Sequence, residues 1–234
     1  MSDAPMQLSF SRLARPPVLF GLIALGLVGV FAKIAGELRE GETGAFDDYF
    51  LNLFRDPADP SHPIGPAWLL EAARDVTSLG SYVILGTIVV LVVVYLLLSR
   101  RRLEAVHLGL AVVAGVVLSN LLKIGFNRPR PNLDNALAVF TASFPSGHAT
   151  MSAVVYLTLG VMLSLREADR RLRILYLTAA ALLTLVVGVS RVYLGVHYPT
   201  DVIAGWCLGI AWAIACALVS EWWRNRVAPG IGEA

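Results

Sequence analysis

Six long apolar segments constrain this chain more than any other feature of its sequence. A helix that crosses a bilayer needs roughly 20 mostly apolar residues, and six stretches qualify: about 17–36, 80–99, 103–124, 147–165, 172–190 and 201–223. Lipid offers no partner to exposed backbone N–H and C=O groups, so each segment must be helical. We therefore predict an all-α fold, a six-transmembrane-helix bundle that forms a single domain over residues 1–234.

The composition agrees with a membrane protein and excludes other classes. Of the 234 residues, 56% are hydrophobic and 15% are charged, whereas soluble domains average about 25% charged residues. A soluble fold could not bury so much apolar surface, so the bilayer is the partner that the composition predicts. The net charge of +2 is too small to indicate nucleic-acid binding. No feature of the sequence assigns an oligomeric state.

The distribution of arginine predicts the orientation of the bundle, because short cytoplasmic loops carry an excess of Lys and Arg. Four groups of arginines fall on one side of the predicted spans: Arg12 and Arg15; Arg100, Arg101 and Arg102; Arg166, Arg170, Arg171 and Arg173; Arg224 and Arg226. The first connection, 37–79, holds nine acidic residues and three arginines. We expect an integral protein of the plasma (inner) membrane, with both termini in the cytoplasm and the first connection outside.

The first connection contains two short apolar patterns with helical spacing. One follows Gly44 and the other follows Gly65-Pro66, a sequence that favours a helix start. Their apolar residues are Phe46, Tyr49, Phe50, Leu53 and Phe54 in the first pattern and Leu69, Ala72, Ala73, Val76 and Leu79 in the second. We predict two short amphipathic helices on the outer surface. They form either a lid that packs on the bundle or a lateral gate for a lipid substrate.

Three polar stretches interrupt this apolar sequence, and the topology places all three on the outer side. They are residues 123–131, 145–148 and 190–201. In the first, Lys123 and Arg130 are cations on the side that the charge bias leaves poor in cations, and an Arg fork with a Lys point charge suits a phosphate group. Arg128, in the same turn, could contact lipid headgroups or the substrate; the headgroup contact is the favoured alternative, so its removal should have little effect on activity.

The second stretch, Pro145 to His148, opens the fourth predicted span. Ser146 is a natural N-cap, and the free N–H groups of a helix start bind anions. Gly147 lets the backbone approach a ligand closely. Ser146 could serve as a plain cap, and His148 as a hydrogen-bonded interfacial residue. The neighbouring N–H groups that could bind an anion, together with a second histidine, favour a catalytic role for His148.

The third stretch joins the fifth span to the sixth. Arg191 is a third candidate ligand for phosphate, and His197 stands four residues before Asp201 in the first turn of the sixth span. At that spacing Asp201 can accept the second N–H of the imidazole, which fixes the tautomer as the Asp of a Ser-His-Asp triad does. Alternatively, Asp201 is an acid favoured by the helix dipole and unrelated to His197. Ionisable residues at membrane segments are functional by default, which favours a nucleophilic His197.

These three stretches resemble the motifs of the type-2 phosphatidic acid phosphatase superfamily, which also contains vanadium haloperoxidases and acid phosphatases. The family pattern is Lys-x6-Arg-Pro, then Pro-Ser-Gly-His, then Ser-Arg-x5-His-x3-Asp. The chain matches it in order and spacing, from Lys123 and Arg130-Pro131 through residues 145–148 to Ser190-Arg191, His197 and Asp201. The motifs cover residues 123–201, and the six-span layout extends the resemblance to most of the chain.

The resemblance implies a two-step mechanism with no cofactor and no metal, because cations replace the metal. His197 would attack phosphorus and form a phosphohistidine, with Asp201 orienting it, and His148 would protonate the leaving alkoxide and then activate water. The groups that would hold the phosphate oxygens are Lys123, Arg130, Ser146, the Gly147 amide and Arg191. His62 and His107, the other two histidines, lie in sequence regions that do not build a metal site with the cluster.

The sequence therefore predicts a metal-independent phosphatase of a lipid phosphate or diphosphate, acting at the extracytoplasmic membrane face. Candidate substrates are phosphatidylglycerol phosphate, phosphatidic acid, undecaprenyl diphosphate and a lipid A phosphate. A lipid phosphotransferase could use the same phosphohistidine, and a detected phosphorylated acceptor would distinguish it. A non-enzymatic anion-binding protein or transporter would have no use for a nucleophile, and transporters place their sites near the midplane. A soluble haloperoxidase does not fit so apolar a chain.

Overall fold

The computed structural model describes residues 16–131 and 141–227, and the regular elements in these two ranges are helical. The predicted all-α fold is confirmed. The elements are α2 (Pro16–Glu40), α3 (Gly44–Asn52), α4 (Ala67–Ser78), α5 (Tyr82–Leu98), α6 (Arg102–Phe126), α7 (Gly147–Ser152), the π-helical η1 (Ala153–Leu157), α8 (Thr158–Ser164), α9 (Arg170–Tyr193) and α10 (Pro199–Val227).

The predicted spans correspond to long helices. Five helical segments of the described chain are long and apolar enough to cross a membrane: α2, α6, the run from α7 through η1 to α8, α9 and α10. The remaining predicted span, the second in chain order (80–99), corresponds to α5, which has 17 residues. It counts as a span together with α4, from which it is separated by a 43° bend. The protein is therefore a membrane-type helical bundle, and its first connection carries the two predicted short helices.

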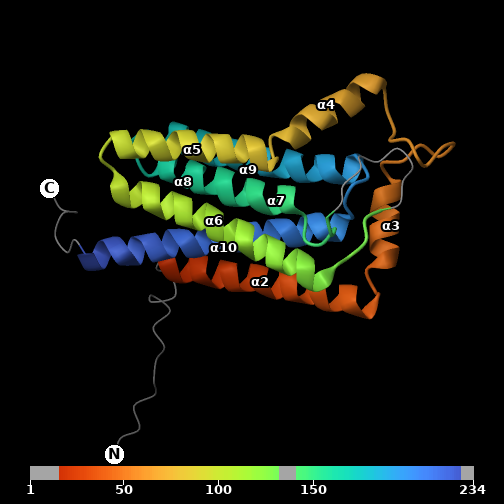
Figure 1. Cartoon of the computed structure of the whole chain (residues 1–234), viewed down its shortest axis with the longest axis horizontal. Coiled ribbons are helices and arrows are strands. Elements are labelled where there is room, and N and C mark those ends of the chain that lie inside the picture. The colour runs from red at the N-terminus through yellow and green to blue at the C-terminus, as the bar shows by residue number, and fades with distance from the viewer. Residues whose placement is uncertain (1–15, 132–140, 228–234) are drawn as a thin grey trace, which may run out of the picture.

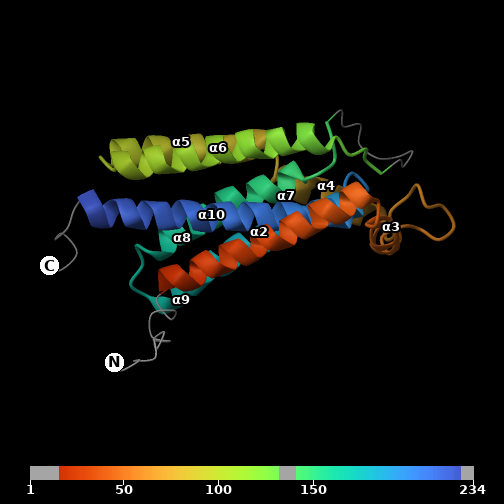
Figure 2. The ribbon, with the colours of Figure 1, turned by 90° about the horizontal axis from the view of Figure 1, so that it is seen from below.

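The bundle has two chemically different ends (Figures 1 and 2). At one end lie the arginine-rich connection between α5 and α6, the connection between α8 and α9, and the last turns of α10. At the other end α3 runs across the helix axes, and α4 leans away from α5. The arginines predicted to face the cytoplasm thus share one end in the described chain. Arg12 and Arg15 lie outside the described residues.

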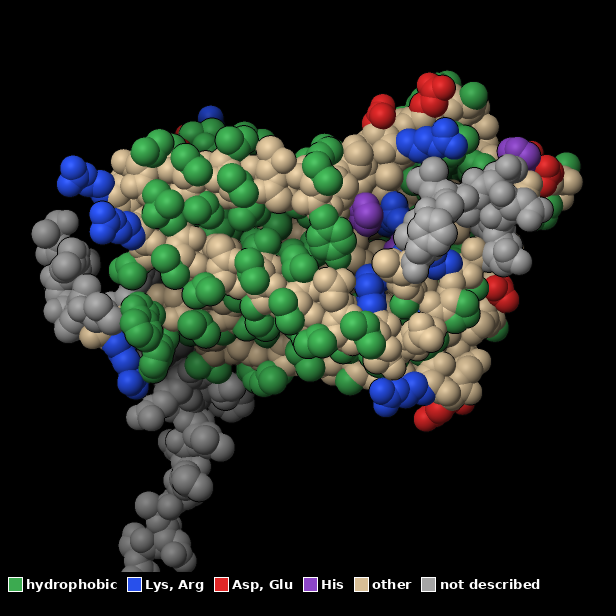
Figure 3. Space-filling model, in the orientation of Figure 1, with side chains coloured by type: hydrophobic (Ala, Val, Ile, Leu, Met, Phe, Trp, Pro, Cys, Tyr) green, Lys and Arg blue, Asp and Glu red, His purple; other side chains and the backbone are tan. Residues whose placement is uncertain are grey.

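The flank of the bundle is apolar, as a lipid-facing surface requires. Figure 3 shows hydrophobic side chains over the middle of the bundle, with Lys and Arg gathered at its ends. Leu98, Ile124 and Leu110 are among the side chains exposed on this flank. Large apolar patches of this kind would be a liability in water. The chain is an integral membrane protein.

The helix that starts at Gly147 is the most enclosed span. It packs against α6, α9 and α10, and Val154 and Val155 in its π-helical turn are fully buried. Its π-turn closes hydrogen bonds one residue wider than an α-turn, a feature that often accompanies functional sites. This central helix carries the Pro145–His148 motif at its start, so the motif is anchored by the core of the bundle.

The two helices of the first connection pack on the bundle, but α3 does not use the face that its sequence pattern predicts. α3 buries Asp47 and Leu51, whereas Phe46 and Tyr49 of the predicted apolar stripe are exposed. The apolar pattern was the wrong guide because a buried polar contact of Asp47 sets the orientation of the helix. α4 follows its pattern more closely, since Ala73 packs with the end of α9.

Two glycines let α10 approach the central helix. A Cβ built at Gly205 would lie 2.9 Å from the Ser146 carbonyl oxygen, and one at Gly209 would lie 2.5 Å from the Thr150 carbonyl oxygen. Both distances are shorter than real Cβ contacts. This close approach brings the start of α10 beside the start of α7, where the Ser146 N–H donates to the Asp201 carbonyl at 2.9 Å.

A side chain at position 209 should force these two helices apart. We expect Gly209→Val to destabilise the protein by about 1–3 kcal/mol, as overpacking of a dense core does. The matched control is Gly86→Val, because a Cβ there meets open space among the described residues. Thermal unfolding of the purified proteins in detergent tests this, and equal midpoints for the two variants would contradict the proposed close contact.

Candidate active site

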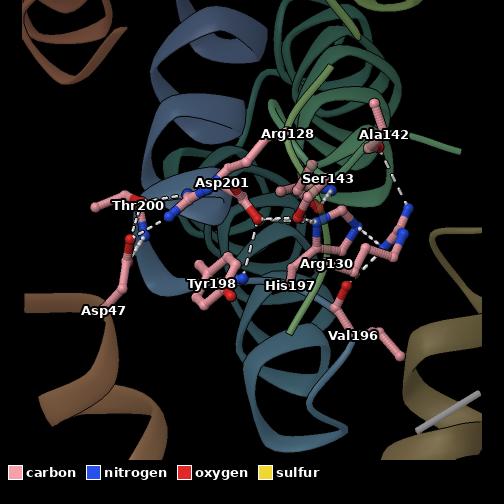
Figure 4. Close-up of polar contacts among 12 residues, drawn as sticks. Asp47, Arg128, Arg130, Ala142, Ser143, Val196, His197, Tyr198, Thr200 and Asp201 are labelled. Carbon is pink, nitrogen blue, oxygen red and sulfur yellow. Dashed lines mark hydrogen bonds and ion pairs between the residues drawn. The ribbon is translucent and has the colours of Figure 1, made fainter. Parts of the chain in front are cut away.

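The three polar stretches meet at the end of the bundle that carries α3 and α4, as the topology predicts. α6 presents Lys123 near its C-terminal end, the loop after it presents Arg130, and α7 begins beside them. The last turn of α9 contributes Arg191, the connection from α9 to α10 contributes His197, and the first turn of α10 contributes Asp201. Figure 4 shows polar side chains from these stretches lying in a row from Asp47 to Arg130.

The hydrogen bonds of His197 fix its tautomer. Arg130 Nη1 lies 3.0 Å from His197 Nε2, and a guanidinium can only donate. Nε2 must therefore be the acceptor, and the ring proton sits on Nδ1, which lies 3.4 Å from Asp201 Oδ2 and 3.3 Å from Ser143 Oγ. His197 thus presents a lone pair on Nε2 towards the cations and an N–H towards the acid, the arrangement of a nucleophile with an orienting carboxylate.

Asp201 is fully buried and has donors on both oxygens. Its Oδ1 accepts from Arg128 Nη1 at 2.6 Å, and its Oδ2 accepts from the Tyr198 N–H at 2.9 Å and from the Ser143 hydroxyl. A buried carboxylate is tolerated only when it is paired and hydrogen-bonded in this way. The orientation of the Asp201 carboxylate is therefore set by Arg128 of the first stretch and by Ser143, two residues before the second, as well as by the backbone just before its own helix.

Three further cations surround the imidazoles. Lys123 Nζ donates to the Ala142 carbonyl at 2.7 Å, and Arg191 Nη1 donates to Thr77 Oγ1 at 2.9 Å. Arg191 is 4% exposed, and its Nε has no partner in the described structure. Arg130 also donates to the Val196 carbonyl at 2.5 Å. The Arg191 Nε is a buried donor that costs free energy until an acceptor reaches it.

His148, Ser146 and Gly147 lie beside these cations. Arg191, His197, Arg130 and Lys123 are all close enough to act electrostatically on the His148 ring. A Cβ at Gly147 would lie 3.5 Å from Lys123 Cε and 2.8 Å from the hydroxyl of Tyr82. Ser146 is buried, and its hydroxyl accepts from the Ala149 N–H at 3.5 Å as the N-cap of α7. The structure thus brings all eight predicted site residues to one place, while their roles stay a prediction.

Burial shifts the pKa of two site residues that lie outside the spans. It lowers the pKa of His197 to about 3, although the neighbouring Asp201 acts in the opposite direction. Burial also lowers the pKa of Arg130, again against the effect of Asp201. His197 is consequently neutral at pH 7 and keeps the lone pair that nucleophilic attack requires.

The headgroup contact predicted for Arg128 is wrong. Its side chain is 9% exposed and is ion-paired at 2.6 Å with both Asp47 and Asp201, so it does not face lipid headgroups. No local pattern indicates this contact, because Asp47 lies in the first connection and pairs with Arg128 across 81 positions. Ser143 was also missed. Its place two residues before the Pro145 motif was the only available signal.

Within the described residues, no group of three or more His, Cys, Asp or Glu side chains is arranged to hold a metal ion. The polar atoms that converge on the site are mostly N–H donors, which suit an anion and repel a metal cation. What the arrangement offers is therefore a neutral imidazole, a second imidazole and a group of cations around them. These are the parts needed to bind an oxyanion and attack its central atom.

Comparisons with known proteins agree with this chemistry. The sequence profile of the PAP2 superfamily matches residues 104–225. The chain is 32% identical over 145 residues to phosphatidylglycerophosphatase B of Bacillus subtilis, spanning 61% of this chain and 71% of that protein. It is 35% identical over 120 residues to an undecaprenyl-diphosphatase of Sulfolobus acidocaldarius, spanning 49% of this chain and 54% of that protein.

A solved structure shows the same fold. The crystal structure of a transmembrane PAP2 type phosphatidylglycerolphosphate phosphatase from Bacillus subtilis superposes with a TM-score of 0.72. The match covers 87% of this chain and 96% of that one at 24% sequence identity. The match to the PAP2 superfamily and the phosphatase relatives confirm the predicted family and the prediction of a phosphatase. The chain belongs to the PAP2 superfamily and is a membrane-embedded phosphatase.

Proposed function

We propose that the protein hydrolyses the phosphate or diphosphate group of a membrane lipid through a phosphohistidine on His197. The observation that carries this proposal is the fixed tautomer of His197, with Nδ1–H towards Asp201 and the Nε2 lone pair towards Arg130. A histidine held in this way is prepared to attack phosphorus, whereas a structural histidine needs no lone pair directed at a cation.

The charge of the site supports a phosphate ligand. Lys123, Arg128, Arg130 and Arg191 supply four cations, and Asp47 and Asp201 supply two carboxylates. The cluster therefore carries two excess positive charges in a setting where unpaired charges are costly. A phosphate monoester dianion would neutralise this excess, and its oxygens would give the orphaned Arg191 Nε an acceptor.

The proposed reaction has two steps. The phosphate oxygens draw the Arg130 guanidinium from His197, and Nε2 forms a bond to phosphorus as the bond to the leaving alkoxide breaks. His148, entering this step as an imidazolium, gives the alkoxide its proton and becomes neutral. His148 then takes a proton from a water molecule, the water oxygen attacks phosphorus, the P–N bond breaks, and inorganic phosphate leaves. Arg130, Arg191 and Lys123 stabilise the charge on the equatorial oxygens in both steps.

The place of the site supports a substrate that stays in the bilayer. The site lies at one end of the spans, and the arginine-rich connections lie at the other end (Figure 1). The positive-inside rule then puts the site at the extracytoplasmic face, with the termini in the cytoplasm. Because the site lies at the end of the spans, a lipid could present its phosphate to Arg130 while its tails remain in the hydrocarbon region.

The substrate class remains broader than one lipid. The named relatives include an enzyme for a glycerophospholipid phosphate and one for a polyprenyl diphosphate. The candidates are therefore phosphatidylglycerol phosphate, phosphatidic acid, undecaprenyl diphosphate and a lipid A phosphate. The donors of the site address the phosphoryl group that all four share, so the proposal commits to that group.

Release of inorganic phosphate from these four lipids in detergent tests the proposed activity. We expect release in the presence of EDTA by the wild type and none by His197→Ala. His62→Ala is a matched control, because His62 lies in the outer loop and is exposed. Activity that survives in His197→Ala would overturn the nucleophile. A phosphorylated acceptor in place of free phosphate would identify a phosphotransferase.

Removing the charge of Asp201 tests the orienting role. Asp201→Asn should lower kcat by several orders of magnitude, since the corresponding change in a serine protease costs about 10⁴-fold through the wrong tautomer. Single-turnover assays with a lipid monophosphate measure this directly. Wild-type turnover in this variant would show that Asp201 only favours the start of α10.

The proposed sidedness can be tested with cysteines in two exposed loops. We expect Ala58→Cys, in the first connection, to react with a membrane-impermeant maleimide in intact cells. Ala168→Cys, between α8 and α9, should react only after permeabilisation. The native Cys207 and Cys216 are buried and half-buried, which keeps the background low. The reverse labelling pattern would place the site in the cytoplasm.

A further inference from the structure

The contact between α3 and the start of α10 has no place in the mechanism described above. Asp47 on α3 is fully buried and accepts at 2.9 Å from the Thr200 N–H and at 2.8 Å from the Thr200 hydroxyl. Its Oδ2 also accepts from Arg128 Nη2 at 2.6 Å. A carboxylate with this many donors in a nine-residue surface helix indicates a specific role, because burying it costs free energy unless its partners are in place.

Arg128 joins this carboxylate to the orienting acid. One terminal nitrogen, Nη2, contacts Asp47, and the other, Nη1, contacts Asp201 Oδ1 at 2.6 Å and Thr200 Oγ1 at 2.9 Å. The guanidinium also stacks on the Tyr198 ring, with 4.1 Å from Cζ to the ring centroid. Figure 4 shows that Asp47, Arg128, Asp201 and His197 follow one another in space, from left to right across the view.

We propose that Arg128 and Asp47 are positioning residues, in which Asp47 fixes Arg128 and Arg128 fixes the carboxylate of Asp201 against His197. The proposal rests on the proposed function of His197 as the nucleophile. Neither residue touches phosphate: both terminal nitrogens of Arg128 are engaged with carboxylates, and Asp47 would repel an anion. Their effect on the reaction therefore passes through Asp201.

The geometry explains why an arginine is needed. Asp201 must keep Oδ2 towards His197 Nδ1, and the Arg128 contact on Oδ1 prevents the carboxylate from rotating. The planar fork of Arg can contact two carboxylates at once, which a Lys ammonium does less well. Although burial acts against it, the carboxylates of Asp201 and Asp47 raise the pKa of Arg128, so the bridge stays charged.

The balance of charge explains why Asp47 is needed. An unpaired Arg128 would cancel the charge of Asp201, and Asp201 must stabilise the positive imidazole of the phosphohistidine. With Asp47 present, the side chains of Asp47, Arg128 and Asp201 together carry one net negative charge beside His197. Asp47→Asn should consequently weaken this stabilisation, although the hydrogen-bonding shape of the side chain is kept.

Steady-state kinetics on the full-length protein tests the proposal, with orthovanadate as a probe of phosphate binding. We expect Arg128→Gln and Asp47→Asn to lower kcat by roughly 10- to 100-fold, as small misplacements of catalytic groups do. KM and the inhibition constant of orthovanadate should stay within about threefold of the wild type, because the phosphate contacts are untouched. Arg128→Lys should retain more activity than Arg128→Gln.

A double-mutant cycle separates positioning from a general structural effect. In the Asp201→Asn background, Arg128→Gln should cost less than about threefold in kcat, because residues that act as one unit are not additive. Additive losses would overturn the proposal, and so would wild-type kcat in both single variants. If KM and the inhibition constant of orthovanadate rise together in Arg128→Gln, the result would indicate that Arg128 binds phosphate directly.

Matched controls come from the same end of the bundle. Arg39→Gln removes an exposed arginine that stacks on Phe126 at 5.0 Å, and Asp48→Asn removes the exposed neighbour of Asp47. Both should keep wild-type kcat.

If Arg128→Gln fails to fold, as judged by its thermal midpoint, Asp47→Asn decides the outcome, because it changes one charge and no volume. An active His197→Ala would refute the proposed function, whereas an inactive His197→Ala with fully active Arg128→Gln and Asp47→Asn would refute only the positioning role.

Discussion

The geometry of the site depends on one buried carboxylate, that of Asp201. Its carboxylate accepts from Arg128 of the first polar stretch, from Ser143 just before the second and from the Tyr198 N–H of the third. Its backbone carbonyl also accepts from the Ser146 N–H. An unsatisfied buried polar group costs about 1–3 kcal/mol, and a charged one costs more. The stretches therefore cannot separate without exposing Asp201 to that cost, which gives the carboxylate a structural role beside the orienting role that we propose for it.

The outer connection reinforces the same arrangement from a different side. Arg55, from this connection, donates to the carbonyls of Val192 and Tyr193, where α9 ends, and the Tyr193 hydroxyl donates to the Ile64 carbonyl at 2.7 Å. The last carbonyls of a helix lack partners inside the helix, so these contacts complete the end of α9. Because Arg191 stands in that last turn, its position depends on residues that are far away in sequence.

The parts that sequence could predict are those governed by local rules. Long apolar segments must be helices in lipid, so the long helices were predictable to within a few residues at each end. Residues within four positions of one another, such as His197 and Asp201, could be placed on one helix start. The Asp47–Arg128 contact could not be predicted, because it joins a surface helix to a loop and leaves no periodic pattern. The apolar stripe of α3 even indicated the opposite face.

Recognition of phosphate and selection of a lipid are separate problems in this fold. In the proposed function, the cations around His197 would respond to charge and to oxygen geometry, and a phosphate monoester and the terminal phosphate of a diphosphate offer both in nearly the same form. A site built from Lys123, Arg130 and Arg191 alone therefore has little basis for choosing between such lipids, and the named relatives act on both kinds. Discrimination requires contacts with the part of the lipid that differs. At this end of the bundle such contacts must come from outside the cation cluster, where α3 and α4 present Tyr49, Phe46 and Trp68 as exposed side chains.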